Sequence, residues 1–175
     1  MNWFDIIKED EFSPRRGEFP GTTSEAIAEE LSNDNVKITF DEKHSKFVLT
    51  VSHSKFGEIY TNNDIRTLSS LTNRVEQANK YIKFIDEILK VFKNKIHGYD
   101  LLEGNGVNFL LVIGKHNIEL QVVFWRSDSD LAFMIQKKGI GWPGVWEYLS
   151  EGRTFENMWN FFTRQFRNYI NTLGE

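Results

Sequence analysis

Asp100, Glu119 and Gln121 are the acidic and polar residues whose spacing comes nearest to a catalytic pattern. An acidic residue precedes a predicted hairpin, and a second acidic residue stands two positions before a polar one. Carboxylates are ligands that Mg²⁺ prefers, and bound Mg²⁺ can activate water for hydrolysis. Asp128 and Asp130 lack the glycine and terminal glutamate of a calcium loop, so we interpret them as part of a turn between strands.

The first of these patterns resembles the metal-binding core of the PD-(D/E)xK nuclease superfamily. In that superfamily two carboxylates on adjacent strands hold Mg²⁺ for phosphodiester cleavage. The resemblance implies a Mg²⁺-dependent nuclease that uses Asp100, Glu119 and Gln121, with Glu87 as a further carboxylate. The chain departs from the pattern because Gln121 stands where lysine is usual and no proline precedes Asp100. Charges on exposed strands and turns explain the same residues, so the nuclease is our alternative hypothesis.

Aromatic side chains are a second feature that could bind a partner. The chain of 175 residues contains 15 Phe, 5 Trp and 5 Tyr, enough for a large core or an exposed aromatic surface. Trp142, Trp146 and Tyr148 surround a Pro-Gly turn, where such rings can anchor a protein interface, and Arg153 adds positive charge nearby. These four residues are our candidates for binding a protein partner. For the segment itself, the interpretation that we favour is a loop that covers the end of a sheet.

The first 22 residues are predicted to form an N-terminal arm and a linker. Residues 2–9 can form a short amphipathic helix with Trp3 and Phe4 on its apolar side, and prolines and glycines interrupt residues 13–21. The opening Met1-Asn-Trp-Phe-Asp-Ile-Ile-Lys8 is similar to the first residues of small uncharacterised proteins from archaea and marine phages, a resemblance that implies no activity. We expect Trp3 and Phe4 either to bind a partner or to fold back onto the domain.

Composition and charge disfavour several classes of function. The net charge is −4 and the pI is about 5.6, whereas binding to phosphates needs clustered Lys and Arg, so nucleic acid is not an expected partner. The absence of cysteine excludes disulfides, a cysteine nucleophile and thiolate zinc sites. No apolar stretch approaches the roughly 18 residues of a membrane span. We therefore expect a cytoplasmic protein with no cofactor and no contact with a membrane.

The elements that position these residues are predicted from hydrophobic periodicity. Apolar residues spaced three and four apart predict one long helix, with a cap at Thr61 or Asn62 and a stop at Gly98. Its seam consists of Leu68, Leu71, Val75, Ala78, Ile82, Ile85, Leu89, Phe92 and Ile96. The apolar arc widens in the second half, so we expect this helix to pack within its own domain. Self-association through the seam is the alternative.

Alternation of apolar and polar residues predicts the strands. Residues 36–51 are predicted to form a hairpin with one solvent-exposed face. Residues 107–125 are predicted to form a hairpin that is apolar on both faces, and residues 131–135 to add one strand. A helix begins at Thr23, and an aromatic helix follows a cap at Thr154. The predicted fold is α+β: a mostly antiparallel sheet of about five strands, packed by the long central helix and the C-terminal helix in a single domain over residues 23–175.

The leading function hypothesis is a non-enzymatic protein-interaction or structural module. We favour this class because aromatic residues are abundant while signatures of catalysis are faint. The expected partner is a protein, either a different chain or a second copy of this one, bound through the aromatic surface, the N-terminal arm or both. The Mg²⁺-dependent nuclease is the alternative.

Overall fold

The structure is a computed structural model that describes residues 21–103, 105–124, 131–138, 145–149 and 154–174. The fold is α+β, and the chain forms two compact units, Met1–Asn79 and Lys80–Glu175, each of which we describe by itself. Helix α3 (Leu68–Val91) begins in the first unit and ends in the second. The single domain expected over residues 23–175 stays a prediction.

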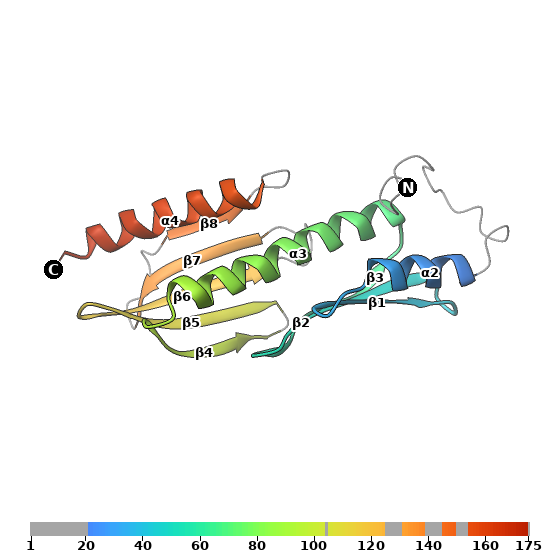
Figure 1. Cartoon of the computed structure of the whole chain (residues 1–175), viewed down its shortest axis with the longest axis horizontal. Helices are drawn as coiled ribbons and strands as arrows, with labels where there is room; N and C mark the ends of the chain where they lie inside the picture. The colour runs from blue at the N-terminus through green and yellow to red at the C-terminus, as the bar shows by residue number, and fades with distance from the viewer. Residues whose placement is uncertain (1–20, 104, 125–130, 139–144, 150–153, 175) are drawn as a thin grey trace. The chain divides into compact units, whose positions relative to one another are not determined.

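The first unit contains helix α2 (Gly21–Leu31) and a three-stranded antiparallel sheet. Its strands are β1 (Val36–Asp41), β2 (Lys46–His53) and β3 (Gly57–Ile65), in the order β1-β2-β3. The predicted hairpin of β1 and β2 is confirmed, with Val36 paired to Val51 and Phe40 paired to Phe47. Helix α2 lies along β1 (Figure 1) and buries Ile27. One face of the small sheet is therefore covered by helix, as the alternation requires.

Strand β3 occupies residues that the sequence predicted to be the start of the long helix. Thr61 and Asn62, the predicted caps, instead pair with Thr50 and Leu49 in the sheet. Two register shifts in the pairing of β2 with β3 disrupt the strict alternation of side chains, and this explains why the strand pattern is weak. The helix begins later, where Thr67 Oγ1 accepts a hydrogen bond from the Ser70 N–H at 3.1 Å.

The second unit contains a five-stranded antiparallel sheet, the last turns of α3, and helix α4 (Phe155–Thr172). The strands are β4 (Ile96–Leu102), β5 (Gly106–Ile113), β6 (His116–Phe124), β7 (Leu131–Lys137) and β8 (Val145–Leu149), in the order β4-β5-β6-β7-β8. The side chains of one face are at most 1% exposed, namely Val107, Phe109, Leu111, Ile118, Leu120, Val122, Phe124, Leu131, Phe133 and Ile135. We call this the helix face and the opposite side the second face.

Both helices of the second unit pack on the helix face. From α3, the buried Tyr81 donates a hydrogen bond to Val122 O at 2.8 Å, and burial raises the pKa of its hydroxyl far above the ordinary value. From α4, the Phe162 ring lies 5.1 Å from Phe133 and 5.0 Å from Phe84 of α3, between ring centroids. The predicted α+β fold with an antiparallel sheet packed by helices is therefore confirmed. The prediction of one sheet of about five strands is wrong, because the described strands form two sheets, one of three strands and one of five, and residues 36–51 belong to the smaller sheet.

Three element boundaries in the second unit correct the sequence-based prediction. Helix α3 ends at Val91, and Ile96 and the predicted stop Gly98 lie in β4. Ile96 follows Phe92 by four residues, so a helical spacing continues by coincidence into the strand. Residues 145–149, predicted as part of a loop, form β8.

The predicted cap of α4 is confirmed, because Thr154 Oγ1 accepts a hydrogen bond from Asn157 N–H at 3.2 Å.

Across the described residues, no helix combines the length and the apolar character needed to cross a membrane.

Candidate functional site

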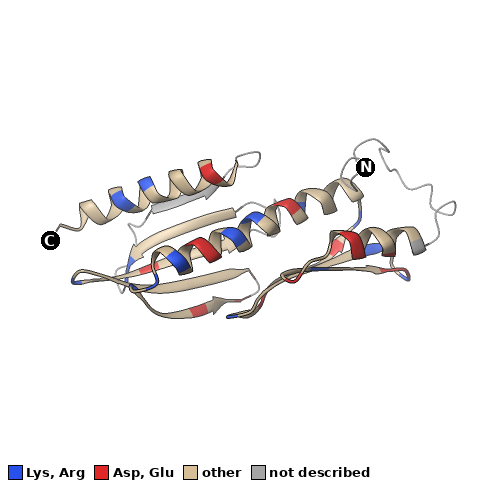
Figure 2. Ribbon diagram, viewed as in Figure 1, with Lys and Arg blue, Asp and Glu red and all other residues tan. Residues whose placement is uncertain are grey.

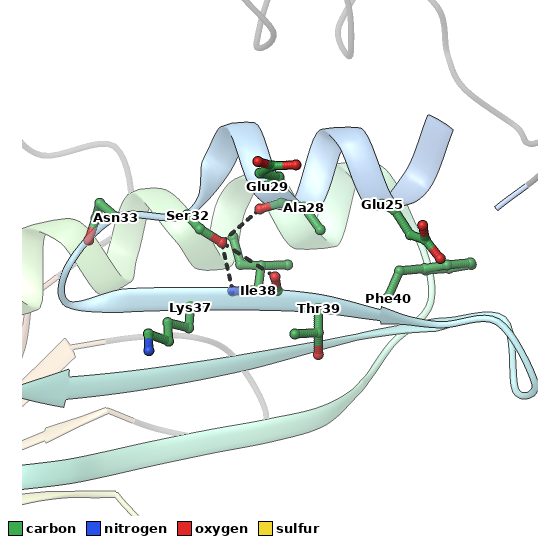
Figure 3. Close-up of a pocket in the computed structure, with 9 residues that line it drawn as sticks. All are labelled: Glu25, Ala28, Glu29, Ser32, Asn33, Lys37, Ile38, Thr39 and Phe40. Atoms are coloured by element: carbon green, nitrogen blue, oxygen red, sulfur yellow. Dashed lines mark hydrogen bonds between the residues drawn. The ribbon is translucent and has the colours of Figure 1, made fainter. Parts of the chain in front are cut away.

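A hollow of about 560 Å³ lies beside β1 and under α2 in the first unit (Figure 3). Its lining residues are Glu25, Ala28, Glu29, Ser32 and Asn33 from α2 and the turn after it, and Lys37, Ile38, Thr39 and Phe40 from β1. The strand contributes four successive residues, although successive side chains of a strand point to opposite faces of its sheet. A hollow that contacts all four must follow the edge of the strand, and we call it the β1 groove.

The outer side of β1 is the free edge of the described three-stranded sheet, because β1 is the first strand in the order β1-β2-β3. Ser52 N–H donates to Asn35 O at 2.8 Å, which identifies this pair as hydrogen-bonded across the two strands. Hydrogen-bonded and non-hydrogen-bonded pairs alternate in an antiparallel ladder. The backbone groups of Val36, Ile38 and Phe40 therefore point outward, into the groove.

Ser32 and Asn33, in the turn after α2, bind the first outward groups of β1 through both side-chain and backbone atoms. Asn33 Oδ1 accepts from Val36 N–H at 2.9 Å, and Asn33 N–H donates to Val36 O at 2.8 Å. Ser32 Oγ accepts from Ile38 N–H at 2.9 Å and donates to Ala28 O at 2.7 Å. A hydroxyl carries one proton, so its longer approach of 3.4 Å to Ile38 O leaves that carbonyl available.

The next outward groups have no partner in the part of the chain that the structure describes. There the Phe40 N–H donates no hydrogen bond and the Phe40 C=O accepts none, and with the Ile38 C=O they form a row of two acceptors and one donor. The Phe40 ring is half-buried and lies 5.0 Å from the Phe47 ring, and Ile38 is 5% exposed. Unpaired backbone groups beside an apolar surface are the features that allow an extended peptide to join a sheet edge.

The charges around the groove are divided between its two sides. Helix α2 contains Glu25, Glu29 and Glu30 and no Lys or Arg, as Figure 2 shows in red, so its side of the groove is acidic. Lys37 projects from β1 on the side away from α2 (Figure 3). Asp41 Oδ2 lies 2.8 Å from Nδ1 of His44, and this hydrogen bond lowers the pKa of Asp41.

We expect Ser32→Ala to lower the free energy of unfolding by about 1–2 kcal/mol. The substitution leaves the Ile38 N–H and the Ala28 carbonyl without their side-chain partner in a half-buried position. Urea denaturation measures the change, and Ser69→Ala, at an exposed position of α3, is the matched control. A loss for Ser32→Ala no larger than for Ser69→Ala would show that the Ser32 hydroxyl does not hold α2 on β1.

The residues of the nuclease hypothesis lie in the second unit, and the structure brings three of them to one face. Asp100 on β4 pairs with Asn108 on β5, which pairs with Gln121 on β6. Glu119 stands two residues from Gln121 and accepts a hydrogen bond from Gln136 Nε2 at 3.0 Å. All of these residues alternate with those of the helix face, so they lie on the second face.

This arrangement differs from the pattern that the resemblance implies. Asp100 and Glu119 are on strands separated by β5, about 10 Å apart, rather than on adjacent strands. Glu87 lies on α3, which packs on the helix face, opposite to Glu119. Within the described ranges, no three His, Asp or Glu side chains come together as a group that could hold a metal ion. Asn108 Oδ1 is buried without a hydrogen-bond partner in these ranges. The nuclease stays a prediction.

Most of the predicted partner-binding residues cannot be placed. Trp3, Phe4, Trp142 and Arg153 lie outside the described residues. The other two lie in β8, where Trp146 pairs with Met134 and Tyr148 with Ala132. The β1 groove was missed by sequence reasoning, and the signal that could have indicated it is Ser32-Asn33 in the short turn before an alternating strand.

Comparison of the chain with protein-family models, curated proteins and solved structures found no match. The resemblance of the N-terminal opening to archaeal and phage proteins therefore stays a prediction, and a functional argument must start from the geometry of the β1 groove.

Proposed function

We propose that this protein is a protein-interaction module that binds an extended segment of a partner protein as an added strand along β1. The observation that carries this proposal is a row of outward backbone groups inside a groove at a sheet edge. The Phe40 N–H and C=O have no partner among the described residues, and only the Ser32 hydroxyl, at 3.4 Å, approaches the Ile38 C=O. An extended backbone offers complementary donors and acceptors at the spacing of a strand. The proposal keeps the class expected from the sequence, at a different surface.

The energetics predict weak binding for a short segment. Three hydrogen bonds contribute about 1 kcal/mol each, and burial of an apolar side chain against Phe40 adds about 2 kcal/mol. This sum of about 5 kcal/mol is offset in part by the entropy lost on association, so the Kd is no tighter than about 0.2 mM. Measurements therefore need millimolar peptide, and residue-resolved detection by backbone amide NMR suits that range.

We expect Phe40→Pro to weaken peptide binding at least tenfold. The substitution removes the outward N–H and leaves the ladder to β2 intact, because that N–H points away from β2. Proline is tolerated on an edge strand at such a position. The measurement is an NMR titration of the 175-residue chain with a heptapeptide that alternates threonine and valine.

Phe40→Ala is the matched control for this experiment, because it removes the same ring and keeps the N–H. We expect it to bind the peptide more weakly than the unchanged protein and more tightly than Phe40→Pro. Equal affinity of the two variants, with folded spectra for both, would contradict strand addition at β1.

A further inference from the structure

We infer that the partner segment carries lysine or arginine side chains at alternating positions, on the side that faces α2. This inference rests on the proposed function, because it describes the segment added along β1. It follows from the charges and spacing of residues on α2 that line the groove.

An added strand would place every second side chain next to α2. Figure 3 shows α2 lying over β1, with Ile38 pointing toward the helix and the Glu25 side chain pointing toward Phe40. Alternate residues of the added segment would share this side of the sheet with Ile38 and Phe40. Their side chains would therefore meet the acidic side of the groove.

The spacing of the two acidic residues that line the groove matches that of a strand. Glu25 and Glu29 are four residues apart on one side of α2 and are separated by about 6 Å along its axis. Side chains on one face of a strand repeat every two residues, or about 6.6 Å. Two basic residues separated by one position could therefore each approach one glutamate. Lys37, on the other side of β1, would repel basic side chains there.

The same charges disfavour a second copy of this chain in the groove. Antiparallel pairing of two β1 strands needs a two-fold axis perpendicular to the sheet, which would bring both α2 helices to the same face. Each α2 carries Glu25, Glu29 and Glu30 and no basic residue, so the two helices would repel each other. A basic segment of a different protein gains from the charges that a second copy would oppose.

Three heptapeptides test the inference with the isotope-labelled 175-residue chain. Valine alternates in them with lysine, with threonine or with glutamate, and binding is followed by the backbone amide shift of Phe40. We expect the lysine peptide to bind at least fivefold more tightly than the glutamate peptide at low salt. Added NaCl should reduce this preference, because the glutamates are exposed.

Glu25→Lys and Glu30→Lys form a matched pair of variants, because both residues are exposed on α2 and only Glu25 lines the groove. We expect Glu25→Lys to reduce the preference for the lysine peptide at least threefold, whereas Glu30→Lys should change it less than twofold. Equal effects of the two substitutions would overturn the role of the groove glutamates.

The outcomes separate this inference from the proposed function. Equal binding of all three peptides, with a shift at Phe40, would overturn the charge preference and leave strand addition standing. No shift at Phe40 with any peptide would overturn both. A dimer detected by light scattering, together with slow hydrogen exchange of the Phe40 amide without peptide, would mean that a second copy occupies the groove. That result would overturn the inference.

Discussion

Phe162→Ala is expected to lower the free energy of unfolding by about 3–5 kcal/mol, the usual cost of removing a large ring from a packed core. Phe162 is 0% exposed, and its ring lies 5.0 Å from Phe84, 5.3 Å from Trp159 and 5.1 Å from Phe133, between centroids. These neighbours come from α3, α4 and β7, so one ring joins both helices to the sheet. Its removal leaves a cavity that three elements would have to close together.

The neighbouring Phe161→Ala is the control, because Phe161 is half-buried and its ring lies 6.1 Å from Phe133. We expect about half the loss for this variant, since less apolar area leaves the core. Urea denaturation followed by circular dichroism measures both, and the near-ultraviolet spectrum, to which Trp159 contributes, reports the packing of aromatic rings. Equal losses for the two variants would contradict the central position of Phe162 in the second unit.

Gly106→Ala is expected to cost about 3 kcal/mol, the upper part of the range for overpacked positions. A Cβ atom on Gly106 would overlap with Val122 O and lie 2.9 Å from Val123 Cα. Both atoms belong to the backbone of β6, so no rotation of a side chain relieves the clash. The two strands must separate locally, which weakens hydrogen bonds in the middle of the five-stranded sheet.

Gly98→Ala provides the matched control for this substitution on the adjacent strand β4. A Cβ atom there would lie 3.5 Å from Leu110 Cδ1, an ordinary contact with a flexible side chain, so we expect a change within about 0.5 kcal/mol. Thermal unfolding compares the two variants. A loss for Gly106→Ala below 1 kcal/mol, or one equal to that for Gly98→Ala, would show that β5 and β6 are not packed as closely as the structure places them.

The sequence predicted those elements whose pattern is set by burial. Strand β1 alternates buried Val36 and Ile38 with exposed residues, and β5 and β6 present an unbroken apolar face at alternate positions, so period-two patterns identified them. Thr154 marked the start of α4 because a side-chain oxygen is needed to cap the first backbone N–H groups. Each of these elements could be predicted because it carries either a capping residue or a regular pattern of buried side chains.

Other elements could not be predicted from the sequence because they bury few side chains. In β4, Tyr99 and Leu101 are 40% and 46% exposed, so this strand lacks an alternating core pattern. Local sequence also does not specify which strands are neighbours. The placement of Asp100 and Glu119 on opposite sides of β5 follows from strand order, and a sequence pattern cannot distinguish it from the adjacent pair of a metal site.

The β1 groove also could not be predicted from the sequence, because it depends on which elements become neighbours in the folded chain. Its edge is formed when Ser32 binds the Ile38 N–H and α2 settles over β1, so residues from two elements define it together. Nothing in the residues 36–41 by themselves indicates which side of the strand stays unpaired. The acidic residues of α2 were visible in the sequence, but their relation to a strand edge was not.

The exchange rate of the Phe40 amide hydrogen, with and without saturating lysine–valine heptapeptide, tests strand addition most directly. The Lys37 and Thr39 amides are internal standards, because they face β2 and are bonded in both states. We predict at least tenfold slower exchange at Phe40 with peptide, and unchanged exchange at Lys37 and Thr39. Binding of the peptide with no change in exchange at Phe40 would contradict the account, because the segment would then occupy another surface.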